Sequence, residues 1–194
     1  MDTPPSRKEL THDRIVETAA RAIRRAGFHG VGVADIMKEA GLTHGGFYAH
    51  FASRDALLAE ALERAGRDGS VRIAEQAERA RVKGHSALRA LVDGYLSERH
   101  LNGAENGCAV AALASEMPRQ APEVREAAAQ RVRKLIDTVQ RALPADAASQ
   151  APMVASQMVG ALQLARALGP NAQGKALLAS TRQSLLAQFD TPLH

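Results

Sequence analysis

Apolar residues recur along the chain at the three- and four-residue spacing that is typical of amphipathic helices. Between residues 11 and 26 they fall on one face, so a helix is expected there, capped by Thr11 and stopped by Gly27. Phe28 is expected to fill the core behind the next turn. No segment alternates apolar and polar residues as a half-buried strand would, and no internal repeat is found. The pattern predicts an all-α protein.

Two short helices and a longer one are predicted next. Gly32 is expected to cap a helix over residues 33–40, with Asp35 in its first turn, and Gly41 to end it. Thr43 then caps a helix over residues 44–50, and Ser53 caps the helix that follows. The two short helices carry apolar residues that can pack them together: Ile36, Ala40, Leu42 and Phe47. The segment therefore predicts an N-terminal three-helix helix-turn-helix domain.

The remainder of the chain predicts further helices with weaker boundaries. They are expected over residues 86–102, 108–117, 123–143, 153–168 and 175–189, after a charged linking segment at 64–81. Pro122 suits the first turn of its helix, whereas Pro152 either starts its helix or kinks it. We therefore expect two domains, residues 1–60 with a mobile tail over 1–8, and a C-terminal helical domain over residues 61–194.

Composition agrees with a helical fold, because 45% of the 194 residues are hydrophobic but only 3% are aromatic. No apolar run approaches the roughly 18 residues of a membrane span, and Cys108 is the single cysteine. A cytoplasmic protein without a membrane partner is expected. The net charge of +4 permits nucleic acid as a partner. Residues 1–60, however, carry eight basic and eight acidic side chains, so DNA binding there depends on where the charges point.

The second short helix carries residues that suit DNA. Its outward face would present Thr43, His44, Tyr48 and His50. Gly45 and Gly46 would let the backbone approach DNA closely, and the hydroxyl and imidazole groups can reach bases or phosphates. Arg54, at the start of the next helix, could meet a phosphate. In a protein without this function the same pattern would mean only that Phe47 and Phe51 are core residues and the histidines lie on the surface.

A family resemblance favours the DNA-binding interpretation. The order and spacing of several short motifs resemble the DNA-binding domain of the TetR family over roughly fifty residues: Gly27-Phe28, Ala34-Asp35-Ile36, Ala40-Gly41-Leu42-Thr43, Gly45-Gly46-Phe47-Tyr48, His50-Phe51 and Ser53-Arg54-Asp55. The resemblance implies that Thr43, His44 and Gly45 open the recognition helix. It also implies that Tyr48, His50 and Arg54 meet the DNA backbone. Gly32 is also counted among the DNA-binding residues, but it stands where the family commonly has Ser or Thr and offers no hydroxyl for a phosphate contact.

The C-terminal part resembles the same family loosely, through Asn106-Gly107-Cys108 and Val159-Gly160-Ala161-Leu162. The resemblance implies a small-molecule effector pocket in this domain, and a homodimer formed by the last two helices around Gly160 and Ala161. The expected function is a repressor that binds palindromic operator DNA as a homodimer and is released by a small hydrophobic effector. Candidate pocket residues, each also a candidate for ordinary core, are Leu91, Tyr95, Cys108, Leu113, Met117, Met158 and Leu162.

Three alternatives differ in function from a ligand-gated repressor. An enzyme is disfavoured because the sequence lacks GxSxG, HExxH and Glu-x-x-His motifs, and neither a catalytic residue, a metal nor a cofactor is expected. A constitutive DNA-binding protein would lack the small-molecule response, which thermal shifts with a compound library would reveal. In the third alternative the switch is oxidation of Cys108, at the expected start of a helix.

Overall fold

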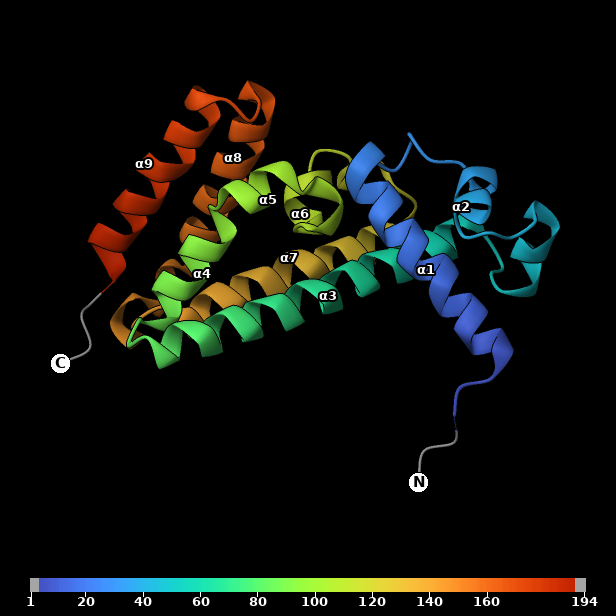
Figure 1. Cartoon of the computed structure of the whole chain (residues 1–194), viewed down its shortest axis with the longest axis horizontal. Helices are drawn as coiled ribbons and strands as arrows, with labels where there is room; N and C mark the ends of the chain where they lie inside the picture. The colour runs from blue at the N-terminus through green and yellow to red at the C-terminus, as the bar shows by residue number, and fades with distance from the viewer. Residues whose placement is uncertain (1–3, 191–194) are drawn as a thin grey trace.

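The structure is a computed structural model that describes residues 4–190, apart from the side chain of Arg81. Within that range the chain is helical and contains no strand, as the sequence predicts (Figure 1). Its α-helices are α1 (Arg7–Ala26), α2 (Val33–Glu39), α3 (Arg54–Val82), α4 (Ala87–Tyr95), α5 (Glu98–Asn102), α6 (Ala109–Leu113), α7 (Pro122–Ala142), α8 (Ala151–Leu168) and α9 (Ala172–Phe189). The 3-10 helices are η1 (His44–Ala49), η2 (Ala104–Asn106), η3 (Met117–Arg119) and η4 (Ala145–Gln150).

Helix α1 begins at Arg7, four residues before the predicted start. The Ser6 hydroxyl accepts from the Glu9 backbone N–H at 3.3 Å, and the Glu9 carboxylate accepts from the Ser6 N–H at 2.7 Å. This capping box stabilises the first turn, and Thr11 instead donates to the Arg7 carbonyl inside the helix. The prediction of a tail over residues 1–8 is therefore wrong for Arg7 and Lys8, and residues 1–3 lie outside the described residues.

The short elements of the N-terminal domain lie where the sequence predicts them. Gly27 and Gly41 end α1 and α2 at φ of 79° and 71°, a region that favours glycine. Gly32 is the N-cap of α2, and its N–H donates to the Asp35 carboxylate at 3.2 Å. The predicted helix at 44–50 is a 3-10 helix, η1, whose N-cap Thr43 makes no side-chain capping bond.

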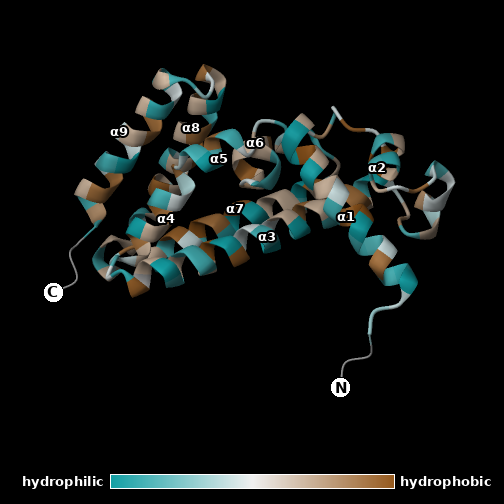
Figure 2. Cartoon of the chain, viewed as in Figure 1, coloured by the Kyte–Doolittle hydropathy of each residue, from teal (hydrophilic) through white to brown (hydrophobic). Residues whose placement is uncertain are grey.

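Helices α3 and α7 lie side by side and extend from the N-terminal domain along the C-terminal domain (Figure 1). Helix α3 continues without a break through residues 61–82, so the segment predicted to link the domains is itself helical. Figure 2 shows hydrophobic and hydrophilic residues mixed along α1, α3 and α7, as expected of helices with one buried face. The N-terminal unit and the C-terminal unit are thus joined by continuous helix.

Two apolar cores hold the chain together. The first joins α1, α2, η1 and the beginning of α3 to α6, η3 and the start of α7, and it includes the fully buried Phe28. The second joins α4 to the antiparallel pair α8 and α9. Pro152 lies in the first turn of α8, so it starts that helix. Within residues 4–190, no helix combines the length and apolar character that crossing a membrane requires.

The helix predicted over residues 86–102 is in fact two helices, α4 and α5. The chain leaves helical geometry at Leu96, with ψ of 39°, and Ser97 caps α5 by accepting from the His100 N–H at 3.2 Å. The turn brings the α5–α6 connection back towards α1, with which η2 packs. Apolar periodicity did not detect this break, because Leu96 and Leu101 are both buried.

Candidate DNA-binding face and effector pocket

The surface of η1 is exposed and polar, while its inner side is fixed in the core. Tyr48 is 72% exposed, whereas Phe47 is 1% exposed and stacks on Phe51 with ring centroids 5.5 Å apart. Thr43, His44 and Gly45 are also exposed, and the His44 and Tyr48 rings meet edge to face. Three of the four side chains predicted to face outward, those of Thr43, His44 and Tyr48, therefore do so, and the buried Phe47 and Phe51 lie beneath them.

The two glycines of η1 have different surroundings. A Cβ added at Gly45 would meet no heavy atom within 4 Å, and one at Gly46 would meet Met37 Cε at 3.7 Å, an ordinary contact. Neither has the positive φ that requires glycine. The packing of the domain therefore does not require a glycine at position 45.

His50 and Arg54 are turned inward. His50 is half-buried, its Nδ1 is buried without a hydrogen-bond partner, and its ring lies 6.1 Å from that of His12 on α1. The Arg54 guanidinium donates to the carbonyl oxygens of Phe28 and Val31, the latter at 3.3 Å. Arg54 therefore stabilises the α1–α2 connection through these two hydrogen bonds. Its side chain is not the free phosphate ligand that the resemblance implies.

Some basic side chains of the N-terminal domain form ion pairs, and others do not. Arg21 pairs with Glu17 at 2.7 Å and Arg25 with Glu39 at 2.8 Å. Among the described residues, four exposed basic side chains of this domain have no ion pair: Arg7, Lys8, Arg14 and Lys38. Burial, the His12 charge and the Lys8 charge, in that order, lower the pKa of His50. Sequence reasoning missed these cations because a charge count cannot tell paired from unpaired groups.

A cavity of about 330 Å³ lies in the C-terminal domain. Its wall comes from α3, α4, α5, the α5–α6 connection, the start of α6, and α7. Of the predicted pocket residues, Leu91, Tyr95 and Cys108 line it. Its size lies at the lower end of small-molecule sites, which span roughly 300–1,000 Å³.

The other four predicted pocket residues do not line this cavity. Leu113 and Met117 pack in the first core, beside α1, α3 and α7. Met158 and Leu162 are fully buried in the second core, under α9. The sequence groups them with the pocket residues because helical periodicity identifies a buried side chain but does not distinguish close packing from a cavity wall.

The cavity is also more basic than the sequence suggests. Its lining includes four cationic side chains, and among the described residues that line it there is no Asp or Glu: the cations are Arg72, Arg99, Arg131 and Lys134. The candidate pocket residues predicted from the sequence include none of these four cations. These residues lie on polar faces of α3, α5 and α7, and sequence alone does not indicate that three such faces converge.

A neutral histidine fixes one wall of the cavity. His100 Nε2 accepts from the Cys108 backbone N–H at 2.9 Å, so Nδ1 carries the proton and donates to the Tyr95 carbonyl at 2.8 Å. Burial, opposed by the bond to Tyr95 and aided by nearby arginines, lowers the pKa of His100 to about 4. The imidazole thus holds Cys108 and Tyr95 together while remaining uncharged at neutral pH.

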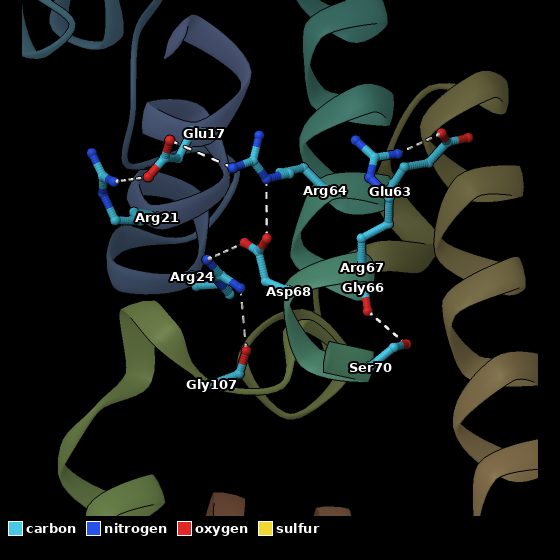
Figure 3. Close-up of polar contacts among 10 residues, drawn as sticks. All are labelled: Glu17, Arg21, Arg24, Glu63, Arg64, Gly66, Arg67, Asp68, Ser70 and Gly107. Atoms are coloured by element: carbon cyan, nitrogen blue, oxygen red, sulfur yellow. Dashed lines mark hydrogen bonds and ion pairs between the residues drawn. The ribbon is translucent and has the colours of Figure 1, made fainter. Parts of the chain in front are cut away.

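The cavity wall is bonded directly to the N-terminal domain. Arg24, on α1, donates to the Gly107 carbonyl oxygen at 3.4 Å and lies 3.9 Å from the Asp68 carboxylate (Figure 3). Asp68 also accepts from Arg64 at 3.0 Å, and Arg64 lies 3.5 Å from Glu17 of α1. Gly107 and two neighbours of Asp68, Gly66 and Gly69, line the cavity. A change in the cavity wall can therefore reach α1 through one polar network.

This architecture, a helix-turn-helix domain joined by continuous helix to a helical domain with an internal cavity, is that of a helical transcriptional regulator. A family profile described as "Bacterial regulatory proteins, tetR family" matches residues 15–61, and one described as "Tetracyclin repressor-like, C-terminal domain" matches residues 84–178. The HTH-type transcriptional regulator Rv0196 of Mycobacterium tuberculosis strain H37Rv is 33% identical over 166 residues, covering 79% of this chain and 83% of its own length. The chain belongs to the TetR family of transcriptional regulators.

Solved structures agree with this fold. Reduced NemR of Escherichia coli has a TM-score of 0.75 at 20% identity, covering 95% of this chain and 99% of its own. A TetR-family regulator from Agrobacterium tumefaciens has a TM-score of 0.76 at 23% identity, covering 95% of this chain and 100% of its own. At this level of identity the likeness concerns the fold alone.

Proposed function

We propose that this protein is a cytoplasmic, ligand-responsive repressor that binds palindromic operator DNA as a homodimer. DNA binding is assigned to η1, and release to a small molecule in the cavity of the C-terminal domain. The observation that carries the proposal is the bond between Arg24 of α1 and Gly107 of the cavity wall. It gives a ligand in the cavity a physical route to the DNA-binding domain.

On the DNA side, η1 would enter the major groove with His44 and Thr43 towards the bases. The Tyr48 hydroxyl would contact the backbone, and the unpaired cations Lys8 and Lys38 would take the phosphate role that Arg54 does not fill. Phosphate contacts position a protein on DNA, whereas contacts to base edges specify sequence. His44 is therefore assigned to specificity and Lys38 to affinity.

The homodimer would form through α8 and α9. Three apolar residues of α8 remain exposed on the single chain, namely Met153 at 39%, Leu164 at 61% and Leu168 at 46%. Gly160 has open space around it, which permits close approach of a second helix. Ala161 and Leu185 are buried within the chain at 6% and 1% exposure, so they belong to its own core. Leu164 and Leu168 are the better candidates for the interface.

Two copies are needed because η1 is short and contacts few base pairs. A two-fold dimer places its recognition elements in successive major grooves about 34 Å apart, or a multiple of that spacing, and reads a palindrome. The ligand would bind better to the conformation that cannot engage both half-sites, and so shift the dimer towards it.

The test is selection of bound sequences from a random DNA pool, with the full-length protein. We expect enrichment of a palindrome whose half-sites lie one or two helical turns apart. Enrichment of no sequence, or of an unpaired half-site bound by a monomer, would contradict the proposal. If the protein binds the selected duplex and no cavity ligand changes its affinity, it is a constitutive DNA-binding protein and not a ligand-responsive one.

A further inference from the structure

We propose that the cavity ligand is an amphipathic organic anion, with an apolar body and a single anionic head group such as a carboxylate. This inference rests on the proposed function in that it names the effector class for the same cavity. It concerns binding to the protein alone, so it can be tested without DNA.

The first observation is the charge of the wall. Arg72, Arg99, Arg131 and Lys134 line the cavity. None of the four has an ion pair among residues 4–190. Because no carboxylate of the lining balances these four charges, an anion is the ligand whose charge the wall complements.

The second observation is the environment of Arg131. Its side chain comes from α7, only 7% of the residue is exposed, and its Nε is buried without a hydrogen-bond partner. A buried guanidinium nitrogen without a partner is costly, since it has lost the water that would solvate it. A carboxylate can accept from two guanidinium N–H groups at once, so it would supply the partner that Nε lacks and bind a second N–H group as well.

Gly66 makes room for this arginine. A Cβ at position 66 would lie 1.8 Å from Arg131 Nη1, so any larger residue on α3 would displace the guanidinium. Gly66 itself lines the cavity. Because Gly66 has no side chain, the guanidinium of Arg131 can lie beside the cavity. A larger residue at position 66 would occupy the space that the guanidinium fills.

The third observation is the apolar part of the same wall. Ile73, Leu91, Val110 and Leu135 line the cavity together with Tyr95. The Tyr95 hydroxyl is buried with only the Cys108 thiol, a weak hydrogen-bonding group, beside it, so a polar atom of a ligand could bind it as well. A neutral hydrophobic molecule would leave Arg131 Nε without a partner, and a highly charged molecule would leave the apolar wall uncovered. An amphipathic monoanion satisfies both.

The experiment is isothermal titration calorimetry of the full-length protein with two matched pairs of probes. The pairs are 2-naphthoate with naphthalene-2-carboxamide, and decanoate with decanamide, so each anion is compared with a neutral molecule of nearly the same shape. We expect at least one acid to bind roughly tenfold or more tightly than its amide, the size expected of a charge-assisted hydrogen bond. Its affinity should also fall as salt is raised.

Substitutions locate the head group. Arg131→Met keeps most of the side-chain volume without the charge and should weaken that acid roughly ten- to hundredfold, with little effect on the amide. Arg133→Met is the matched control on the same helix, since Arg133 pairs with Glu126 at 2.6 Å and does not line the cavity. Lys134→Met, at an exposed lining position, gives a second reading if Arg131→Met fails to fold.

Three results would overturn the inference: amides that bind as tightly as the acids, no binding of either acid by folded protein at millimolar concentration, or equal weakening by Arg133→Met and Arg131→Met. Failure of the proposed function is a different result, because a protein that binds the acid but no DNA keeps this inference and loses the other. A protein that binds a palindrome and is released only by neutral compounds loses this inference alone.

Discussion

The guanidinium of Arg24 and the carbonyl oxygen of Gly107, 83 residues apart in sequence, form a hydrogen bond between the DNA-binding domain and the cavity wall. The Arg24 side chain is only 1% exposed. Burial, offset in part by Asp68, lowers its pKa to about 10, so it stays protonated at neutral pH. Hydrogen bonds of a buried charged group are stronger than those in water, and this contact connects α1 with the cavity wall in addition to the continuous helix α3.

The first prediction distinguishes Lys38, which is proposed to contact a DNA phosphate, from Arg54, which is proposed to stabilise the fold. Lys38→Ala should weaken binding to all DNA sequences alike and lower the slope of log K against log salt by about 0.9, the value for one phosphate contact. Arg54→Ala should instead leave the slope unchanged and reduce the free energy of unfolding by about 1–3 kcal/mol, since it removes the donor to two carbonyls. DNA binding at several salt concentrations and urea denaturation measure both. A reduced salt slope in Arg54→Ala would restore its phosphate role.

The second prediction uses the open space at Gly45. Gly45→Ala should fold with unchanged stability, because the added Cβ meets no atom within 4 Å. It should nevertheless weaken operator binding, since the methyl group would lie between η1 and the DNA backbone. Thermal unfolding and fluorescence anisotropy with the operator give the two numbers. If Gly45→Ala folds normally and binds the operator with wild-type affinity, Gly45 does not lie at the DNA contact.

The third prediction concerns assembly. Leu164→Glu places a charge on the exposed apolar stripe of α8 and should produce folded monomers that bind the operator weakly. Ala161→Glu, by contrast, buries a carboxylate in the core under α9 and should lower the melting temperature of the chain itself. Light scattering with a thermal melt distinguishes these outcomes. A dimeric Leu164→Glu protein would place the interface elsewhere.

The fourth prediction follows from His100, whose pKa in the folded protein is about 4 against an ordinary value of 6.5. Between these values the unfolded chain binds a proton that the folded protein does not, so stability falls as pH is lowered, by up to about 1.4 kcal/mol per pH unit. His100→Gln, which can still accept from Cys108, should remove that part of the slope. The exposed His85→Gln is the control. Equal slopes in wild type and His100→Gln, from denaturation at pH 4–7, would contradict this account.

The sequence predicted the DNA-binding domain well, because its elements are bounded by local signals. Gly27, Gly41 and Ser53 end or cap their helices as expected, and Phe47 is buried while Tyr48 is exposed. Helix α1 begins earlier than predicted because Ser6 and Glu9 form a capping box ahead of Thr11, which is also a residue type that caps helices. Local chemistry therefore sufficed for this part of the fold.

The cavity could not be predicted in the same way, because it depends on how distant helices converge. Arg131 and Gly66 are far apart in sequence and meet only once α3 and α7 pack. Met158 and Leu113 have the same apolar character as Leu91, yet only Leu91 lines the cavity. Nothing in the sequence around Arg24 indicates a partner at Gly107. Such contacts become visible only in three dimensions.

The most direct test of a ligand-gated repressor is anisotropy with the selected operator, with and without an acid that calorimetry shows bound in the cavity. We predict that the acid weakens operator binding by roughly 5- to 150-fold in wild type and in Arg21→Met. Arg21 lies on the same helix but pairs with Glu17 at 2.7 Å. Arg24→Met should fold, bind the acid and bind the operator, yet lose this response. Operator affinity that bound acid leaves unchanged in wild type, or a full response in Arg24→Met, would contradict the account.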